Sequence, residues 1–112
     1  MYKIEAIIRK SKFDEVQEAL HQIDVNFFSY WDVTGVGNER RGSVYRGIEY
    51  STSDIQRRFL VIVVSEGFLN EALETLRKSA TTGKVGDGKI FVSRLEEVIR
   101  IRTNERGTNA LK

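Results

Sequence analysis

The spacing of apolar residues changes once within the first 25 positions, from every second residue to every third or fourth. Between Ile4 and Ile8, apolar and polar residues alternate, which predicts a strand over about residues 2–9 with one face in a core. Apolar residues then recur at helical spacing over residues 13–23, and Ser11 precedes them as a potential helix N-cap. The chain therefore opens with a strand followed by a helix.

The rest of the chain predicts four further elements. Residues 26–36 are rich in aromatic and β-branched side chains, which favours a second strand with both faces partly buried. The unbroken apolar run 59–64 is typical of a central strand covered on both faces. Apolar residues at helical spacing predict a second helix over residues 69–80, and a glycine-rich turn leads into a last strand at 89–93. The polar tail from Asn104 is expected to be loose.

This order of elements predicts an α+β fold of the ferredoxin-like type, βαββαβ, as one domain over residues 1–112. A domain of this size leaves strand edges and much surface uncovered, so we expect a homo-oligomer. The same fold hosts RNA binders, metal binders, small enzymes and regulators. The function must therefore be argued from the candidate site.

Charge and composition exclude several function classes. The chain has 18 basic and 16 acidic side chains, and this balanced surface, together with the absence of the aromatic RNA-binding signature, argues against nucleic acid as a partner. There is no cysteine, no apolar leader and no run approaching the roughly 18 apolar residues of a membrane span. We expect a cytoplasmic protein without direct membrane insertion.

No catalytic constellation is visible in the sequence. The single histidine, His21, lies off the apolar stripe of the first helix, and no nucleophile has an adjacent base. A small phosphoryl-transfer enzyme built on Lys89 and Asp87 is the rival hypothesis. We expect a protein that is not an enzyme, with at most weak ATP hydrolysis.

A long segment, about residues 37–55, joins the second and third predicted strands. It contains tyrosines, an isoleucine and arginines among its glycines and hydroxyl residues, a mixture that is typical of interfaces and not of linkers. The alternative is an extended hairpin with a solvated tip. We interpret the segment as an arm that binds a partner or is modified.

The glycine-rich turn, about residues 82–89, contains the G-x-x-x-x-G-K spacing of a P-loop at 83–89. Ile90 stands where a magnesium-binding hydroxyl is needed, and these glycines precede a strand instead of a helix, so we reject a P-loop NTPase. Glycines in succession still allow backbone N–H groups to converge on an anion, with Lys89 as the countercharge. An ordinary helix C-cap and turn is the alternative.

Near the C-terminus, Arg100 and Arg102 alternate with apolar and hydroxyl residues. On a strand this spacing places both guanidinium groups on one face, a geometry suited to a polyphosphate. A solvated strand edge is the alternative.

Four segments together carry a resemblance to a known family. They are residues 3–9, the Y-R-G-I-E-Y block at 45–50, the T-G-K-V-G-D-G-K-I-F-V block at 82–92, and 100–103. The chain closely resembles the PII nitrogen-regulatory family along nearly its whole length. The resemblance implies a trimeric signal-transduction protein that binds ATP or ADP in clefts between subunits, with magnesium and 2-oxoglutarate joining ATP at the base of the long segment.

The resemblance also assigns roles to individual residues. Those assigned to the nucleotide are Ile7, Gly35, Gly37, Val63, Thr82, Gly86, Asp87, Gly88, Lys89, Arg100 and Arg102. The turn would hold phosphates from one subunit, the two arginines would come from its neighbour, and Ile7 and Val63 would flank the adenine. Residues assigned to partner binding are Arg40, Arg41, Tyr45, Arg46 and Tyr50, and Tyr50 matches a tyrosine that many relatives have uridylylated or adenylylated. The implied partners are an ammonium channel, which would bring the protein to the membrane, or a nitrogen-metabolism enzyme.

The sequence departs from the family pattern at the base of the long segment and near the C-terminus. Relatives have a glutamine-lysine-glycine step just after the position of Gly37, where this chain reads Asn38-Glu39-Arg40-Arg41-Gly42, and the segment is one residue shorter. A carboxylate there can bind magnesium but repels a dicarboxylate effector. Arg57 replaces a lysine that contacts this effector, and Asn104 replaces a turn glycine. The alternative functions are an adenine-nucleotide sensor with a different effector and, third, an RNA-binding ferredoxin-like module.

Overall fold

The computed structural model describes residues 1–35, 44–45, 48–49 and 55–112. The helices and strands follow one another as β1 (Tyr2–Arg9), α1 (Phe13–Gln22), β2 (Ser29–Gly35), β3 (Val44–Tyr45), β4 (Ile48–Glu49), β5 (Ile55–Val64), α2 (Leu69–Ala80) and β6 (Gly88–Arg94). Three short 3-10 helices are η1 (Lys10–Lys12), η2 (Glu66–Phe68) and η3 (Gly107–Leu111).

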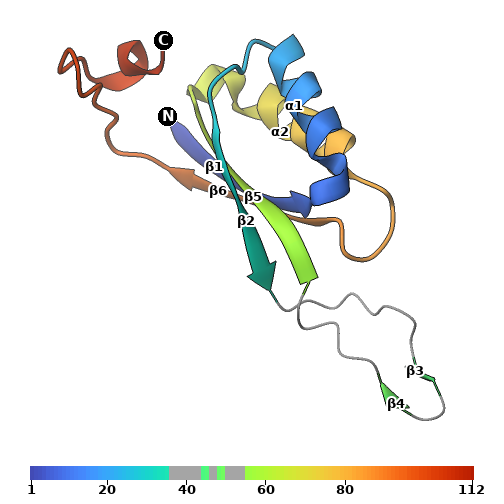
Figure 1. Ribbon diagram of the computed structural model, residues 1–112. Helices are drawn as coiled ribbons and strands as arrows, with labels where there is room; N and C mark the ends of the chain where they lie inside the picture. The colour runs from blue at the N-terminus through green and yellow to red at the C-terminus, as the bar shows by residue number, and fades with distance from the viewer. Residues whose placement is uncertain (36–43, 46–47, 50–54) are drawn as a thin grey trace.

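Four strands form one antiparallel sheet in the order β2-β5-β1-β6, and both α-helices cover the same face of it (Figure 1). This is the predicted ferredoxin-like arrangement. The short strands β3 and β4 pair with each other in a separate two-stranded sheet, inside the segment predicted as a long loop.

The core lies between the sheet and the helices, as the alternation in β1 predicts. Ile4 and Ala6 are fully buried, and Val16 and Leu20 of α1 and Leu76 of α2 pack in the same cluster. Each large aliphatic side chain buried in this way stabilises the fold by roughly 1.5–3 kcal/mol.

No helix among the described residues covers the other face of the sheet (Figure 1). In β5, Leu60 and Ile62 face the helices and are buried, whereas Phe59, Val61 and Val63 on the opposite face are only half-buried. The prediction that this strand is covered on both faces is therefore wrong for the single chain. An unbroken apolar run indicates a strand that is apolar on both faces. It does not indicate whether the same chain or another subunit buries each face.

The second strand is shorter and more exposed than predicted. β2 begins at Ser29, not at residue 26, and only Val33 along it is half-buried. Because β2 is an edge strand, one of its sides has no neighbour. The aromatic residues that suggested a longer strand have other roles: Phe28 packs edge-on against Phe13 at 6.3 Å between ring centroids, while Phe27 is 89% exposed.

The start of α1 and the C-terminal segment also differ from the predictions. Ser11 lies within η1 and caps no helix; Lys12 holds the N-cap position of α1 without a side-chain cap, and its ammonium group pairs with Glu15 at 2.9 Å. The tail is not loose, because an Ile99–Arg106 bridge and η3 fold it back on itself. No helix within the described ranges is long and apolar enough to cross a membrane.

Candidate functional site

The glycine-rich turn lies at one end of the main sheet, together with Gly35 and Ile55, the strand residues nearest the long segment. We call this end of the sheet the loop end. There β1 and β2 finish while β5 and β6 begin (Figure 1). The strand register pairs Ile7 with Lys89, Arg9 with Arg57, and Gly35 with Ile55. Residues predicted to contact phosphates and residues at the base of the long segment are thus brought together by the sheet itself.

Glycines shape the turn because its backbone adopts conformations that other residues rarely adopt. Gly83, Gly86 and Gly88 have φ values of +81°, +101° and +103°. A Cβ atom on Gly88 would lie only 1.7 Å from the carbonyl oxygen of Ile7. Gly88 therefore allows β6 to start in direct contact with β1.

Asp87 holds the turn together through its carboxylate. Its Oδ2 accepts hydrogen bonds from the Thr81 hydroxyl at 3.0 Å and from the backbone N–H groups of Thr82 and Gly83 at 2.8 and 2.9 Å. Its Oδ1 accepts from the Thr82 hydroxyl and from Nε of Arg9 at 3.0 Å. These bonds, first of all the one from the Thr82 hydroxyl, hold the pKa of Asp87 well below its usual range.

Several donors of the turn remain available for a ligand. Within the part of the chain that the structure describes, the backbone N–H groups of Val85 and Gly86 have no hydrogen-bond partner, and Lys84 and Lys89 form no ion pair. Converging N–H groups beside an unpaired ammonium group attract an anion. The Asp87 carboxylate organises the turn, so an anion bound there would contact these neighbours and not the carboxylate.

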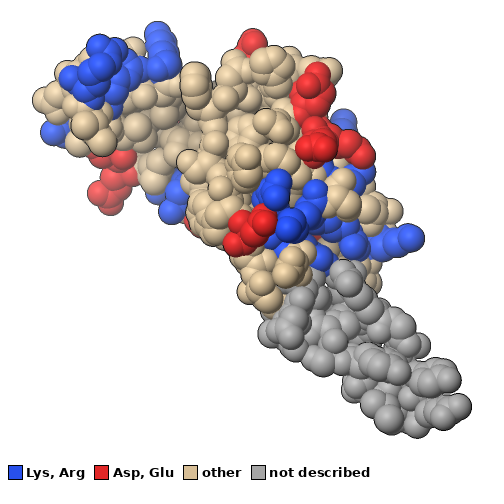
Figure 2. All heavy atoms as spheres, viewed as in Figure 1, with Lys and Arg blue, Asp and Glu red and all other residues tan. Residues whose placement is uncertain are grey.

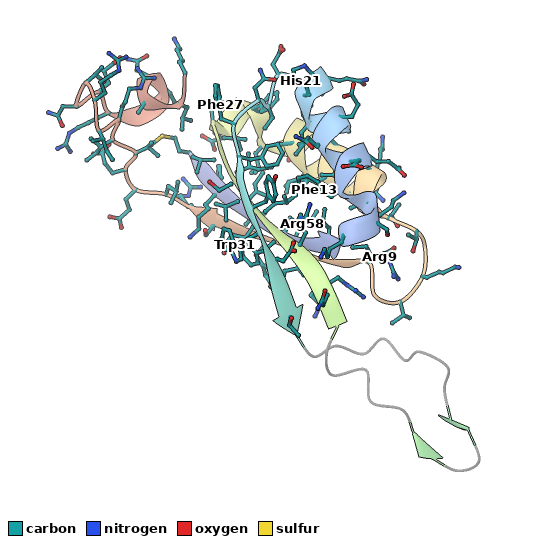
Figure 3. The ribbon with its side chains drawn as sticks, viewed as in Figure 1. Arg9, Phe13, His21, Phe27, Trp31 and Arg58 are labelled. Carbon is teal, nitrogen blue, oxygen red and sulfur yellow. The ribbon has the colours of Figure 1, made fainter. Side chains whose placement is uncertain are left out.

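The loop end is rich in basic side chains, which gather next to the long segment (Figure 2). Asp32 forms ion pairs with Arg58 at 2.9 Å and Lys10 at 3.0 Å, and the hydrogen bond from Arg58 is the main cause of its lowered pKa. Arg58 also lies over the Phe13 ring at 4.5 Å, between the helices and the sheet (Figure 3). Arg57 is only 8% exposed, and its Nη1 donates to the carbonyl of Gln56 at 3.0 Å.

The C-terminal arginines do not form the predicted pair on one strand face. Residues 101–103 form a turn, and Arg100 donates to Glu105 at 2.8 Å, to the carbonyl of Asn109 at 3.1 Å and to that of Lys112. Arg102 is exposed and has no partner among the described residues. Alternation predicted a strand, but the local bonds of Arg100 favour a folded-back turn.

Within one chain, the site residues separate into two groups. β6 leads away from the turn for seven residues, about 20 Å at about 3.3 Å per residue, before the segment with Arg100 and Arg102 begins (Figure 1). Ile7 and Val63 share the uncovered face, but Ile7 pairs with Phe59, so they lie four residues or about 14 Å apart along the strands. Gly35 and residues 82–89 lie at the loop end.

Some predicted site residues fall outside the described residues. These are Gly37, Glu39, Arg40, Arg41, Arg46 and Tyr50. Tyr45 belongs to β3. No group of three metal-binding side chains occurs within the described ranges.

Sequence reasoning assigns no role to two residues of the turn network, Thr81 and Arg9. It places Arg9 at the end of the first strand, within the segment 3–9 that carries the resemblance, yet Arg9 contacts both Asp87 and the carbonyl of Val85, at 3.0 and 2.7 Å. The contacts join residues more than 75 positions apart, so no local spacing indicates them.

The fold and the loop end define a class: ferredoxin-like proteins with a basic glycine-rich turn beside a long inserted segment. Comparison with known proteins narrows the class. The family model of Nitrogen regulatory protein P-II matches residues 1–105. The chain is 40% identical to that protein from Azospirillum brasilense and 42% identical to that from Rhodospirillum rubrum, over 99% of this chain and 100% of each relative.

A solved structure agrees with the sequence comparisons. Arabidopsis thaliana PII bound to citrate superimposes with a TM-score of 0.81 at 33% identity, covering 99% of this chain and 89% of that one. The chain belongs to the P-II family of nitrogen regulatory proteins. The resemblance predicted from the sequence is confirmed, and with it a role in signal-transduction regulation and not in catalysis.

Proposed function

We propose that residues 1–112 form one P-II domain that assembles as a homotrimer, binds ATP or ADP in clefts between subunits, and controls a nitrogen-metabolism partner through the long segment. The observation that carries this proposal is the turn at the loop end: Asp87 fixes its shape while Lys89 and the N–H groups of Val85 and Gly86 stay available. Polyphosphates are anions that such a concavity attracts.

The distances within one chain support a cleft built from more than one subunit. Ile7 and Val63 lie about 14 Å apart on one chain, too far to flank a single adenine ring, so they can do so only from two copies. Arg102 likewise meets a ligand at the turn only if it comes from a neighbour. The half-buried face with Phe59 and with Trp31, which stacks on Phe59 at 4.7 Å, offers an apolar surface for that neighbour.

Nucleotide binding is tested by calorimetry with ATP, ADP and AMP. Lys89→Ala and Arg102→Ala should each lower ATP affinity about 10-fold or more without unfolding the protein, because each removes a charged donor to phosphate. Lys78→Ala, on an exposed helix face where Lys78 pairs with Glu74, is the matched control and should bind like the wild type. Unchanged binding in both test variants, or a monomeric protein indifferent to adenine nucleotides, would rule out the cleft.

The effector distinguishes two versions of this function. Arg57, nearly buried at the loop end, supports binding of a dicarboxylate such as 2-oxoglutarate together with MgATP. The carboxylate of Glu39 at the base of the long segment favours the second candidate, a nucleotide sensor with a different effector. Titration of 2-oxoglutarate into the MgATP complex decides between them. If the main effect of Glu39 is to repel the effector, Glu39→Gln should raise the affinity for 2-oxoglutarate.

The long segment is the proposed contact to the partner, a channel at the cytoplasmic membrane face or a cytoplasmic enzyme. Deleting residues 40–50 should abolish partner binding and leave ATP affinity intact, because the turn and strands at the loop end are outside the deletion. A pull-down from native extract with ATP or ADP identifies the partner. The same pull-down with Tyr50→Phe tests whether this tyrosine contributes to partner binding. Loss of nucleotide binding in the deletion variant would contradict a separable arm.

A further inference from the structure

We propose that Arg9 is a positioning residue of the phosphate-binding turn, acting through Asp87. This inference rests on the proposed nucleotide site and adds to it a residue outside the turn. Arg9 ends β1, and its side chain lies at the loop end of the sheet (Figure 3). It reaches the turn from a different strand, so it links the turn to the body of the sheet.

The contacts of Arg9 lie on both sides of a glycine with a positive φ. Its Nε donates to Asp87 Oδ1 at 3.0 Å and its Nη2 donates to the carbonyl of Val85 at 2.7 Å. These two acceptors flank Gly86, whose φ is +101°. One guanidinium therefore fixes the backbone on both sides of Gly86, whose N–H group is one of the donors proposed to bind phosphate.

The effect extends beyond the two direct contacts because Asp87 is shared. The same carboxylate accepts from the N–H groups of Thr82 and Gly83, at 2.8 and 2.9 Å. A displaced Asp87 would release both ends of the turn. Arg9 thus orients donors that it does not itself contact.

The geometry also specifies arginine at this position. The two bonds leave one planar group from different nitrogens, toward a side chain and toward a main-chain carbonyl. A lysine has a single nitrogen on a flexible stem and does not hold both acceptors in a fixed relation. The Arg9 side chain is 18% exposed and that of Asp87 23% exposed, so water competes only partly for the bonds.

The test compares Arg9→Met, which keeps the aliphatic stem, and Arg9→Lys, which keeps the charge, with Asp87→Asn and the Arg9→Met/Asp87→Asn double variant. Titrations with ATP and with adenosine separate phosphate contacts from base contacts. We expect Arg9→Met to weaken ATP binding about 10-fold and adenosine binding less than twofold, with Arg9→Lys recovering little of the loss. Lys12→Met, another cation near the loop end, is the control and should stay within twofold of the wild type.

The double variant identifies the route. If Arg9 acts through Asp87, the double variant should bind ATP no more than about twofold worse than Asp87→Asn alone, because the two substitutions break one network. Additive losses, full rescue by lysine, or an equal loss of adenosine binding would each overturn the proposal, since they indicate a long-range charge effect or general damage.

Amide hydrogen exchange tests the positioning role of Arg9 without relying on nucleotide binding. In Arg9→Met, amide hydrogen exchange should accelerate at Thr82 and Gly83 while Phe91 in β6 keeps its wild-type rate. Unchanged exchange at both turn amides would overturn the positioning role even if ATP binding fell. If the wild-type protein bound no ATP but Arg9→Met still accelerated exchange at Thr82 and Gly83, the proposed function would be contradicted. The role of Arg9 in positioning the turn would remain supported.

Discussion

The glycine-rich turn and the C-terminal segment are organised by side chains of opposite charge. In the turn, the carboxylate of Asp87 gathers donors from Thr81 to Gly83 and from Arg9. In the C-terminal segment, the guanidinium of Arg100 gathers acceptors from Glu105 to Lys112. Each segment has one charged residue at its centre, bonded to its own chain.

In each segment, the charged side chain at the centre is bonded within the chain, whereas a charged side chain two positions further along has no such bond in the described part of the chain. Beside Asp87 and Arg100 stand Lys89 and Arg102, which have no ion-pair partner among the described residues. The central residues keep the segment in shape, and their neighbours are available to a ligand. Charge in a motif therefore does not by itself show which residues bind.

The largest effect should come from breaking the turn at Gly88. Alanine there places a Cβ atom 1.7 Å from the Ile7 carbonyl, and neither backbone can give way without opening the sheet. We expect Gly88→Ala to lower the free energy of unfolding by at least about 3 kcal/mol. Urea denaturation measures the change.

Gly107 provides the matched control in the C-terminal segment. Its φ is also positive, at +72°, but a Cβ atom there meets nothing within 4 Å. Gly107→Ala should cost only about 1–2 kcal/mol, the cost of a left-handed conformation for a residue with a side chain. Equal losses in the two variants would contradict the close approach of β6 to β1.

A second pair of variants tests the different roles of the two C-terminal arginines. Arg100→Ala removes three hydrogen bonds, all partly exposed, and should destabilise the protein by about 1.5 kcal/mol. Arg102→Ala removes no bond seen among the described residues and should leave stability within about 0.5 kcal/mol while weakening ATP binding. Thermal unfolding and calorimetry on both variants give the comparison. If Arg102→Ala proved the more destabilising, the assignment of roles would be wrong.

The fold was predictable from sequence because local periodicity and core burial agree. The alternation at Ile4 and Ile8 and the helical spacing around Leu20 and Leu76 report the same buried cluster that the structure contains. One error occurred where side-chain hydrogen bonds override the alternation of residue types. Alternating residues around Arg100 suggested a strand, but bonds to Glu105 and Asn109 close a turn instead.

The candidate site was predictable only in part. The glycines and Lys89 can be recognised by their spacing and by the family resemblance, because glycine adopts the positive φ values of this turn at the lowest cost. The contacts of Arg9 depend on β1 and β6 lying side by side, which spacing along one strand does not reveal. The uncovered face with Val61 was misread because the apolar run does not show which chain covers it.

A smaller effect is expected at Asn104, which adopts a φ of +63° where the family pattern has glycine. Asparagine tolerates this conformation better than other residues with side chains. Asn104→Ala should lower stability by about 1 kcal/mol, whereas Asn104→Gly should change it by less than about 0.5 kcal/mol. Urea midpoints measured side by side settle this, and a larger loss for glycine than for alanine would mean that the Asn104 side chain makes a contact of its own.

The smallest effect should be the pH dependence of stability that Asp87 causes, because Asp87 stays ionised across neutral pH. Hydrogen bonds from the Thr82 hydroxyl and the other donors lower the pKa of Asp87 in the folded protein. A lowered pKa means that the carboxylate stabilises the fold above its unfolded pKa of about 3.9, and that this contribution is lost as the pH falls toward the folded pKa. The stability difference between wild type and Asp87→Asn should therefore be constant from about pH 5 to 8 and shrink below about pH 4. If this stability difference varied between pH 6 and 8, the acceptor at the centre of the turn would not be an ionised carboxylate. The contrast between a turn held by a negative charge and a C-terminal segment held by a positive charge would then be wrong.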